Sequence, residues 1–485
     1  MEKEKRENKE KHSKISKQMD QGIEKLEKIE HDLNENENKM GVLPINKLIW
    51  SMSLPAMISM FINALYNIVD SIFVARISES ALAAVTLVFP IQMLIVSVGV
   101  GTGVGINSLI SRRLGAKRQE EANSAADHGY ILGVFSWVIF MILGLFFSRP
   151  FIGMFTQNSY ILENASLYMT IVTSFSLFAF ITVVTEKVMQ ATGNMLFPMI
   201  FNILGAVVNV ILDPILIFGW FGLPELGVLG AAAATVIGQF CAMMLALFML
   251  LHYDYHVKIS YKNFKLKWRT VKDIYFVGIP TIIMMSIGSV MTTCLNGILI
   301  KFSATAVAVL GVYFRLNSFI FMPVFGLNQG TLPIIGFNYG AKNKDRLLET
   351  YKRGLRIAIV VMAIGTAIFW IFPKQLLLLF TATSEMLEIG IPALRIISVC
   401  FMAAAYSIIT TGMFQALAHG FLSMLVALLR QLILVVPLTY VLTWQFGLGA
   451  AWYSFPIAEV GSTIITSIFF RYIYNKEIKP LGGQV

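Results

Sequence analysis

The chain has 485 residues, of which 56% are hydrophobic and only 14% are charged. An average soluble domain has about 25% charged residues, so this composition excludes an ordinary water-soluble fold. The formal net charge is +10, but Lys and Arg gather in short links between apolar runs, a pattern typical of membrane proteins. We therefore expect the lipid bilayer, and no nucleic acid, to surround the chain.

Residues 1–46 form a separate, highly charged segment in which Lys and Glu alternate densely. The segment has no apolar core of the kind that a signal peptide needs. It carries one heptad-like stripe, too short to hold a stable helix pair alone. We predict a charged cytoplasmic N-terminal extension, with a short partner-binding helix as the alternative.

After residue 46 the chain breaks into about twelve apolar runs, most of them 20 residues or longer. A run of about 20 apolar residues spans a bilayer as a helix, whereas the strands of a membrane barrel are about ten residues long and alternate in polarity. We predict an all-α polytopic membrane protein. Its twelve spans are 47–76, 82–110, 124–148, 164–191, 195–219, 229–251, 273–300, 307–337, 350–372, 390–412, 420–444 and 449–472.

The charges of the links between these spans predict the orientation of the chain. Lys and Arg concentrate in every second link, at 111–118, 257–272 and 340–354, and in the C-terminal tail. The remaining links carry almost none. Because short cytoplasmic loops are enriched in Lys and Arg, we predict that these basic links and both termini are cytoplasmic.

An internal repeat organises the spans. Several pairs of landmarks are separated by one constant interval in the numbering, which we call the repeat interval: Pro55 and Pro280, Gly115 and Gly340, Gln190 and Gln415, and Phe221 and Phe446. Each copy holds six spans, so both copies enter the membrane from the same side, related by a pseudo-twofold axis along the membrane normal. We predict an N-lobe at 47–252, a cytoplasmic connector at 253–272, a C-lobe at 273–475 and a cytoplasmic tail at 476–485.

Ionisable residues inside the predicted spans point to function, because an Asp or Arg near a helix centre costs roughly 2.5 to 3.5 kcal/mol on insertion scales. Such residues are expected to face protein or water and to find partners. Those that stand out are Asp70, Glu186 and Asp213 in the first half, and Lys301, Arg315, Arg395, Arg430 and Glu459 in the second.

Asp70 ends a polar stripe on the first span. Residues at helical spacing share one helix face, and here they are Asn63, Tyr66 or Asn67, and Asp70. Asp70 lies fifteen residues beyond Pro55, about 22 Å further along the helix and thus toward the outer side. A role as an interfacial acid beside Arg76 is the alternative.

Asn209 and Asp213 are one helical turn apart on span 195–219 and also share a face. Asp213 is expected near the same outer depth as Asp70. Pro214 removes a backbone donor, so capping of a disturbed helix end is the alternative role for Asp213.

Two carboxylates on facing stripes of one lobe favour ion binding over these alternatives. Two close acids can share one exchangeable proton. With oxygens of Asn209 and Thr235 they could instead form a sodium site.

Several stretches resemble the multidrug and toxic compound extrusion (MATE) family, within its bacterial multidrug-efflux branch, over residues 47 to about 475. They are "LPAMISMFINALYNIVDSIFVARI", "SRRLGAK", "EKVMQATGN", "NVILDPILIFG" and "GAAAATVIGQ". The resemblance implies a twelve-helix, two-lobed fold in a bacterial inner (cytoplasmic) membrane. It also implies export of structurally diverse, often cationic drugs in exchange for H⁺ or Na⁺.

The resemblance further implies that Asp70 and Asp213, with Asn209 and Thr235, form the cation-coupling site. It implies that Pro55 bends the first span when the occupancy of that site changes. Glu186 stands where some relatives have an amide or an acid, so it is a further coupling candidate, with pairing to the adjacent Lys187 as the alternative.

The second half departs from one branch of the family, because Pro280–Gly297 contains no acid. We therefore expect coupling in the N-lobe alone. Arg315, Arg430 and Glu459 are expected to neutralise one another. If they line the cavity instead, Glu459 would be the counter-charge for a cationic drug, and Met284 would contribute to its adaptable wall.

Two other classes of function remain as alternatives. A flippase for lipid-linked oligosaccharide or peptidoglycan precursors would need a cavity rich in Arg and Lys to hold pyrophosphate. An enzyme or a nontransporting scaffold is disfavoured, because no nucleotide motif, metal constellation or nucleophile–base pair is recognisable. We expect no cofactor, no structural metal and function as a monomer.

Overall fold

The computed structural model describes residues 38–253, 257–259, 264–380 and 382–482. Most of the predicted N-terminal extension and parts of the connector and tail lie outside these residues. The described chain folds into helices, and none of its residues forms a strand. The all-α prediction is therefore confirmed.

The first half contains α2 to α9. The helices are α2 (Lys39–Val42), α3 (Ile45–Ala75), α4 (Glu79–Gly115), α5 (Gln119–Gly153), α6 (Ser159–Ser174), α7 (Leu177–Ala191), α8 (Leu196–Phe218) and α9 (Val228–His252), with a 3₁₀ turn η1 (Trp220–Gly222) between α8 and α9.

The second half contains α10 to α18 and ends in short irregular turns. The helices are α10 (Trp268–Leu299), α11 (Ala304–Gly340), α12 (Lys344–Ile371), α13 (Pro373–Leu378), α14 (Ser384–Ser398), α15 (Phe401–Ala416), α16 (Gly420–Leu428), α17 (Val436–Phe446) and α18 (Ser454–Ile473). The π-helical turn η2 (Leu429–Val435) joins α16 to α17, and the 3₁₀ turn η3 (Leu448–Tyr453) precedes α18. The turns η4 (Tyr474–Ile478) and η5 (Lys479–Gly482) follow α18.

Ten helices of the described chain are long and apolar enough to cross a membrane, and two bent pairs bring the number to twelve if each pair is one span. The bent pairs are α6 with α7, at 43°, and α14 with α15, at 49°. The sequence predicted an unbroken helix at each of these places. It also predicted a helix from residue 449, where the structure forms the 3₁₀ turn η3.

Side chains from neighbouring helices satisfy backbone carbonyls that the two breaks leave free. Trp137 donates its Nε1–H to the carbonyl of Ser174 at 2.7 Å. In the second half, the hydroxyl of Thr366 donates to the carbonyl of Ser398 at 2.9 Å. A broken helix is tolerated at membrane depth only when such partners exist. These tertiary contacts explain why apolar periodicity alone did not reveal the breaks.

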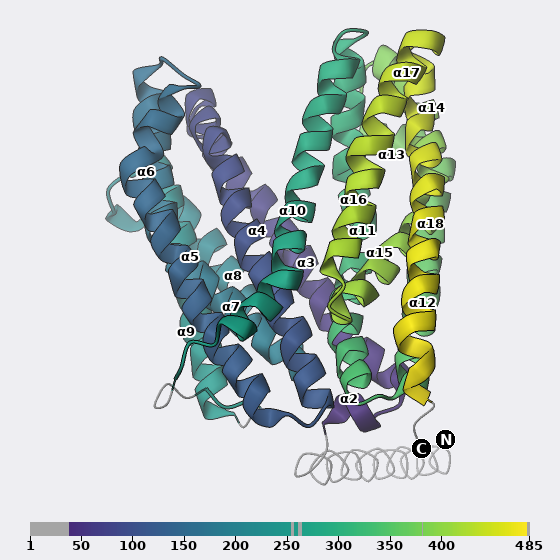
Figure 1. Ribbon diagram of the computed structural model, residues 1–485. Helices are drawn as coiled ribbons and strands as arrows, with labels where there is room; N and C mark the ends of the chain where they lie inside the picture. The colour runs from purple at the N-terminus through teal and green to yellow at the C-terminus, as the bar shows by residue number, and fades with distance from the viewer. Residues whose placement is uncertain (1–37, 254–256, 260–263, 381, 483–485) are drawn as a thin grey trace, which may run out of the picture.

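The two halves meet at one end of the molecule. In Figure 1, α5, α6 and α9 stand on one side and α12, α14 and α18 on the other. The ribbons of the two sides lie close together near α2 and separate toward the opposite end. We call these the α2 end and the far end.

Glycines allow the halves to cross closely, α4 against α10 and α11 against α3. A side chain on Gly105 of α4 would overlap the carbonyl oxygen of Ile274 on α10. A side chain on Gly330 of α11 would overlap Ser53 on α3. Small residues at helix crossings let backbones approach in membranes. Because Gly105 and Gly330 are one repeat interval apart, the repeat relates the two crossings.

A second pair of repeat-related glycines closes the α2 end. A Cβ on Gly115 would overlap the carbonyl oxygen of Phe337, and a Cβ on Gly340 would overlap that of Arg112. Beside this contact, the hydroxyl of Ser108 donates to the carbonyl of Gln415 at 2.6 Å. We call the reciprocal packing of Gly115 and Gly340 the inner contact.

Candidate functional site

Two aspartates meet inside the first half. Asp70 on α3 and Asp213 on α8 have carboxyl groups close enough to interact with each other. Asp213 is fully buried, and Asp70 is half-buried. In each carboxyl group, Oδ1 is buried and receives no hydrogen bond from the described residues. Repulsion between two carboxylates this close falls when a proton or a cation lies between them.

Asn209 and Thr235 complete one side of this aspartate pair. With its amide oriented so that both its nitrogen and its oxygen find partners, Asn209 donates to Oδ2 of Asp213 at 3.3 Å and accepts from the backbone N–H of Thr235 at 3.2 Å. The Thr235 hydroxyl donates to the carbonyl of Ala231 at 3.0 Å on its own helix, α9. The oxygen of that hydroxyl keeps lone pairs for another partner. The structure thus brings together four of the five coupling candidates, which are Asp70, Asn209, Asp213 and Thr235.

Two tyrosines and a glutamine also belong to the site. Tyr66 on α3 interacts electrostatically with Asp70 and Asp213. Tyr168 on α6 is 1% exposed and interacts with Asp70 and Thr235. Gln92 on α4 donates to the Tyr168 hydroxyl at 3.1 Å.

Gln92 and Tyr168 were not predicted from the sequence, because neither is charged and neither lies within two helical turns of Asp70 or Asp213 along the chain. Gln92 is a lone amide within the apolar stretch "FPIQMLIV", and a buried amide in lipid needs a partner. That signal could have led to Gln92. The position of Tyr168 depends on tertiary packing of the bent helix pair α6 and α7.

The polar stripe on α3 divides in the structure. Tyr66 faces the aspartate pair, whereas Asn67 is exposed and donates to the carbonyl of Asn63 at 2.7 Å. The side chain of Asn63 is half-buried. The stripe therefore contributes Tyr66 and Asp70 to the site, and not Asn67.

Pro55 lies where α3 crosses α11. It is half-buried within α3, which continues from Ile45 to Ala75. Its neighbours Ser53 and Met57 face Gly330 and Gly326 of α11. Proline removes one backbone hydrogen bond from a helix. The turn of α3 that lacks this hydrogen bond thus coincides with a close crossing between the halves.

The structure does not bring Glu186 to the aspartate pair. Glu186 on α7 accepts from Lys187 Nζ at 2.8 Å and from Asn202 Nδ2 at 3.0 Å. Asn202 precedes Asp213 on α8 by eleven residues, roughly 16 Å along the helix. Glu186 therefore sits nearer the α2 end, in the ion pair that was the alternative role. A coupling role for Glu186 stays a prediction.

Lys187 links the cluster around Glu186 to the second half of the molecule. Its side chain is 5% exposed, and its Nζ also donates to Gln329 Oε1 on α11 at 3.1 Å. Gly103 of α4 makes room for the Lys187 stem, because a Cβ there would lie 2.6 Å from Lys187 Cγ. The buried cation of the first half is thus neutralised by Glu186 and tied to α11.

The charged residues of the second half form a pair rather than the expected triad. Arg430 Nη1, in the π-helical turn η2, lies 3.5 Å from Glu459 Oε1 on α18. Glu459 is 6% exposed. Arg315 on α11 is exposed and has no partner among the described residues, so the expected neutralisation of Arg315 by Glu459 is wrong. Met284 is half-buried on α10.

Removing Glu459 is expected to destabilise the protein. In Glu459→Gln, Arg430 keeps its charge without its carboxylate, and breaking a buried pair costs about 3 to 5 kcal/mol. The Arg430→Met/Glu459→Met double variant should recover most of this loss, because it leaves no unpaired charge. Thermal unfolding of the purified protein in detergent measures both.

Glu388→Gln removes an exposed carboxylate of the same half and serves as the control, with no expected change in the unfolding midpoint. A Glu459→Gln variant as stable as this control would mean that the pair contributes nothing. A double variant less stable than the single one would contradict the pairing as the source of the loss.

The donor atoms at the aspartate pair suit a proton or a hard cation. Carboxylate, amide and hydroxyl oxygens are the ligands that hard cations prefer. Among the residues that the structure describes, no group of three or more His, Cys, Asp or Glu could hold a metal ion. The four oxygen-bearing residues Asp70, Asn209, Asp213 and Thr235 fit Na⁺ as well as a shared proton.

Two six-helix repeats related by an axis along the membrane normal, with a pair of facing acids inside one of them, form the architecture of secondary transporters. The chain belongs to the MatE family, because the family model matches residues 55–215 and 280–441, one segment in each half. The resemblance found in the sequence is thereby confirmed.

Named relatives agree with this membership. The chain is 27% identical over 418 residues to the multidrug export protein MepA of Staphylococcus aureus (strain MSSA476), covering 86% of this chain and 91% of MepA. It is similar to the structure of a MOP superfamily transporter from Pyrococcus furiosus Vc1, with 27% identity and a TM-score of 0.84 over 92% of this chain and 98% of the other. The outward-facing conformation of a multidrug resistance MATE family transporter gives the same identity and TM-score, over 92% and 99%.

Proposed function

We propose that this protein is a secondary active exporter of structurally diverse, often cationic organic molecules, driven by exchange for H⁺ or Na⁺. The aspartate pair is the observation that carries the proposal, because two facing carboxyl groups with free buried oxygens suit a site that alternately binds and releases a cation. The relative MepA is named a multidrug export protein, which supports this class of substrate.

Coupling follows from the repulsion between the two carboxylates. A proton or Na⁺ bound between Asp70 and Asp213 removes the repulsion and lets α3 and α8 approach. Asn209 holds Asp213 in place while Asp70 moves with α3. Because Pro55 weakens α3 at its crossing with α11, a change at Asp70 can be taken up as a bend of this helix.

In alternating access, the two halves would separate at the α2 end and come into contact at the far end. The halves are in contact at the α2 end and diverge at the far end (Figure 1). Arg112, Arg113, Arg118 and Arg346 lie at the α2 end, beside the inner contact or α2. An excess of Lys and Arg marks the cytoplasmic side. We therefore place the α2 end and both termini in the cytoplasm of a bacterial cell, with the molecule in its inner membrane facing outward.

A second candidate function is the flipping of a lipid-linked pyrophosphate, which cations such as Arg315 and Arg430 could bind. Arg315 is unpartnered among the described residues and could hold a phosphate. Arg430 and Lys187 are less available, because each is paired with a glutamate. Of these three cations only Arg315 is free among the described residues, and a single charge offers little to a pyrophosphate that carries several, so drug export remains the better supported function.

Transport in proteoliposomes tests the proposal and identifies the ion. Ethidium movement is measured under a pure pH gradient and then under a pure Na⁺ gradient, with liposomes lacking a gradient as the control. We expect ethidium to move against its own gradient under one of the two conditions. Movement under neither condition, together with flipping of a fluorescent lipid-linked pyrophosphate, would replace the exporter by the flippase.

A further inference from the structure

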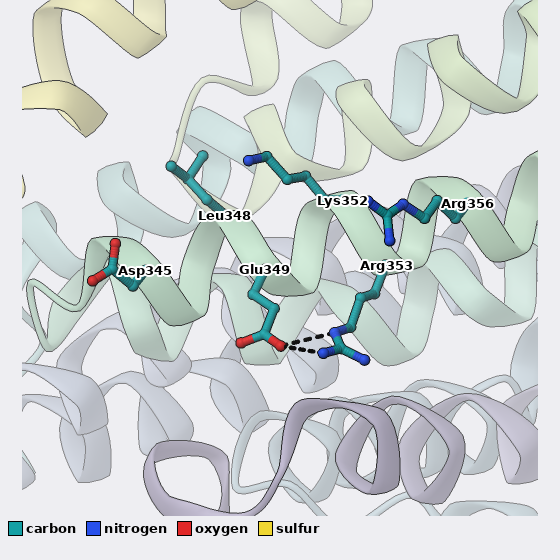
Figure 2. Close-up of a pocket in the computed structure, with 6 residues that line it drawn as sticks. All are labelled: Asp345, Leu348, Glu349, Lys352, Arg353 and Arg356. Carbon is teal, nitrogen blue, oxygen red and sulfur yellow. Dashed lines mark hydrogen bonds and ion pairs between the residues drawn. The ribbon is translucent and has the colours of Figure 1, made fainter.

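A charged surface pocket lies on the first half of α12, near the α2 end. It has a volume of about 380 Å³ and is lined by Asp345, Leu348, Glu349, Lys352, Arg353 and Arg356. Figure 2 shows these side chains along one stretch of the helix. The first turn of α12 reaches the α2 end, because Arg346 donates to the carbonyls of Met40 and Leu43 at 3.1 and 2.7 Å.

The cations of this pocket are not equivalent. Arg353 is engaged, since its Nε donates to Glu349 Oε1 at 2.8 Å (Figure 2) and its Nη1 donates to Asn46 Oδ1. Lys352 and Arg356 are exposed and have no partner among the described residues. They are four residues apart and thus share a helix face. The pocket therefore offers two free cations on one side.

An anion is the ligand that this arrangement favours. Glu349 is neutralised within the pocket by Arg353. The remaining acid, Asp345, precedes Lys352 by seven residues, about 10 Å along the helix. Arginine presents a planar fork that matches phosphate oxygens, and lysine adds a point charge.

The same helix face becomes apolar directly above the cations. Val360 and Ile364 continue the four-residue spacing of Lys352 and Arg356, and they are 58% and 57% exposed. Exposed apolar side chains of a membrane-spanning helix lie against acyl chains. The change from cation to apolar residue takes four residues, about 6 Å. A phospholipid has the same order, with its phosphate just outside its acyl chains.

The repeat shows that this feature belongs to the second half alone. The positions one repeat interval before Lys352 and Arg356 are Asp127 and Ile131 on α5. Asp127 is buried, at 8% exposure. The pair of free cations on α12 is therefore not a consequence of the repeated fold.

We propose that the α12 pocket binds the phosphate of an anionic phospholipid in the leaflet at the α2 end. Lys352 and Arg356 hold the phosphate, and Val360 and Ile364 contact the upper part of an acyl chain. The charge of the pocket and the adjoining apolar stripe together select this ligand over a soluble anion, because a soluble anion would use only the cations.

Lipid titration of the full chain tests the site. The purified protein in detergent is titrated with phosphatidylglycerol, and bound lipid is counted by native mass spectrometry. Each cation near the headgroup contributes about 1 kcal/mol, so Lys352→Gln/Arg356→Gln should weaken the tightest phosphatidylglycerol site by about 30-fold. Phosphatidylcholine, which carries no net charge, should bind the parent at least tenfold more weakly than phosphatidylglycerol.

The matched control is Lys265→Gln/Arg269→Gln, which removes one exposed Lys and one exposed Arg that lie outside the pocket. It should bind phosphatidylglycerol within about twofold of the parent. Lys352→Arg keeps the charge and should do the same, which separates loss of charge from misfolding. Equal affinity in parent and Lys352→Gln/Arg356→Gln would overturn the proposal. Displacement of the lipid by millimolar inorganic phosphate would also overturn it, in favour of a soluble anion site. The measurement needs no ion gradient, so its outcome is independent of the proposed transport function.

Discussion

Cells that express Asp213→Asn in an efflux-deficient host are expected to retain ethidium to the same extent as cells without the protein. Asparagine has nearly the shape of aspartate and neither binds a proton at neutral pH nor carries a charge. The variant therefore keeps the packing of α8 and loses the repulsion from Asp70 that the proposed coupling needs. Asp70→Asn should give the same result, because one charge of the pair is lost in either case.

Folding is expected to survive the Asp213 substitution. Asp213 is fully buried and its Oδ1 receives no hydrogen bond from the described residues, so removing its charge relieves a desolvation cost. The unfolding midpoint of Asp213→Asn should equal or exceed that of the parent. Glu163→Gln, which removes an exposed acid of the same half, should leave efflux unchanged. Unimpaired efflux in both aspartate variants would rule out the aspartate pair as the coupling site.

Gly340→Ala is expected to part the halves at the α2 end. The added methyl group would overlap the carbonyl oxygen of Arg112. A backbone atom of a packed helix can move only slightly to relieve such an overlap. Overpacking of this kind costs typically about 1 to 3 kcal/mol. Because the strain exists only while the inner contact is closed, the equilibrium between closed and open should shift by about 5- to 150-fold. A fall in efflux should accompany the shift.

Distances between spin labels on α4 and α11 at the α2 end measure this shift. Gly311→Ala is the control, because it lies on the same helix with nothing within 4 Å of the added Cβ. The repeat-related Gly115→Ala should behave like Gly340→Ala. A distance distribution for Gly340→Ala identical to that of Gly311→Ala would show that the inner contact tolerates the methyl group and does not control opening.

The fold was largely predictable because a bilayer reduces folding to a few strong rules. Span length, loop charge and the repeat interval gave the number of spans and their division into two repeats. The helix breaks at residues 175–176 and 399–400 were not predictable in the same way. They depend on donors such as Trp137 and Thr366, which lie on other helices and leave no mark on local hydropathy.

The site was predictable where it contains ionisable groups, because placing such a group inside a membrane span costs free energy. Asp70 and Asp213 stood out because acids are rare inside membrane spans. Asn209 followed from its position one helical turn before Asp213. Tyr168 was missed because it could not be told from an ordinary membrane tyrosine. Arg315 was misassigned because sequence gives the depth of a residue along its helix more readily than the direction in which its side chain points.

The acid pair occurs once among the described residues, which bounds the stoichiometry of the proposed exchange. Leu295 and Leu438 stand one repeat interval after Asp70 and Asp213, so the second half offers no equivalent pair of carboxyls. Two carboxyls can discharge at most two protons in a cycle. One proton against one monovalent organic cation moves no net charge, whereas two protons move one charge. Only in the second case does the membrane potential assist export. It then adds about 2.3 kcal/mol per 100 mV, or roughly 50-fold in the concentration ratio of the exported cation across the membrane. Measuring the electric current that accompanies transport would therefore show how many of the two carboxyl groups release a proton in each cycle.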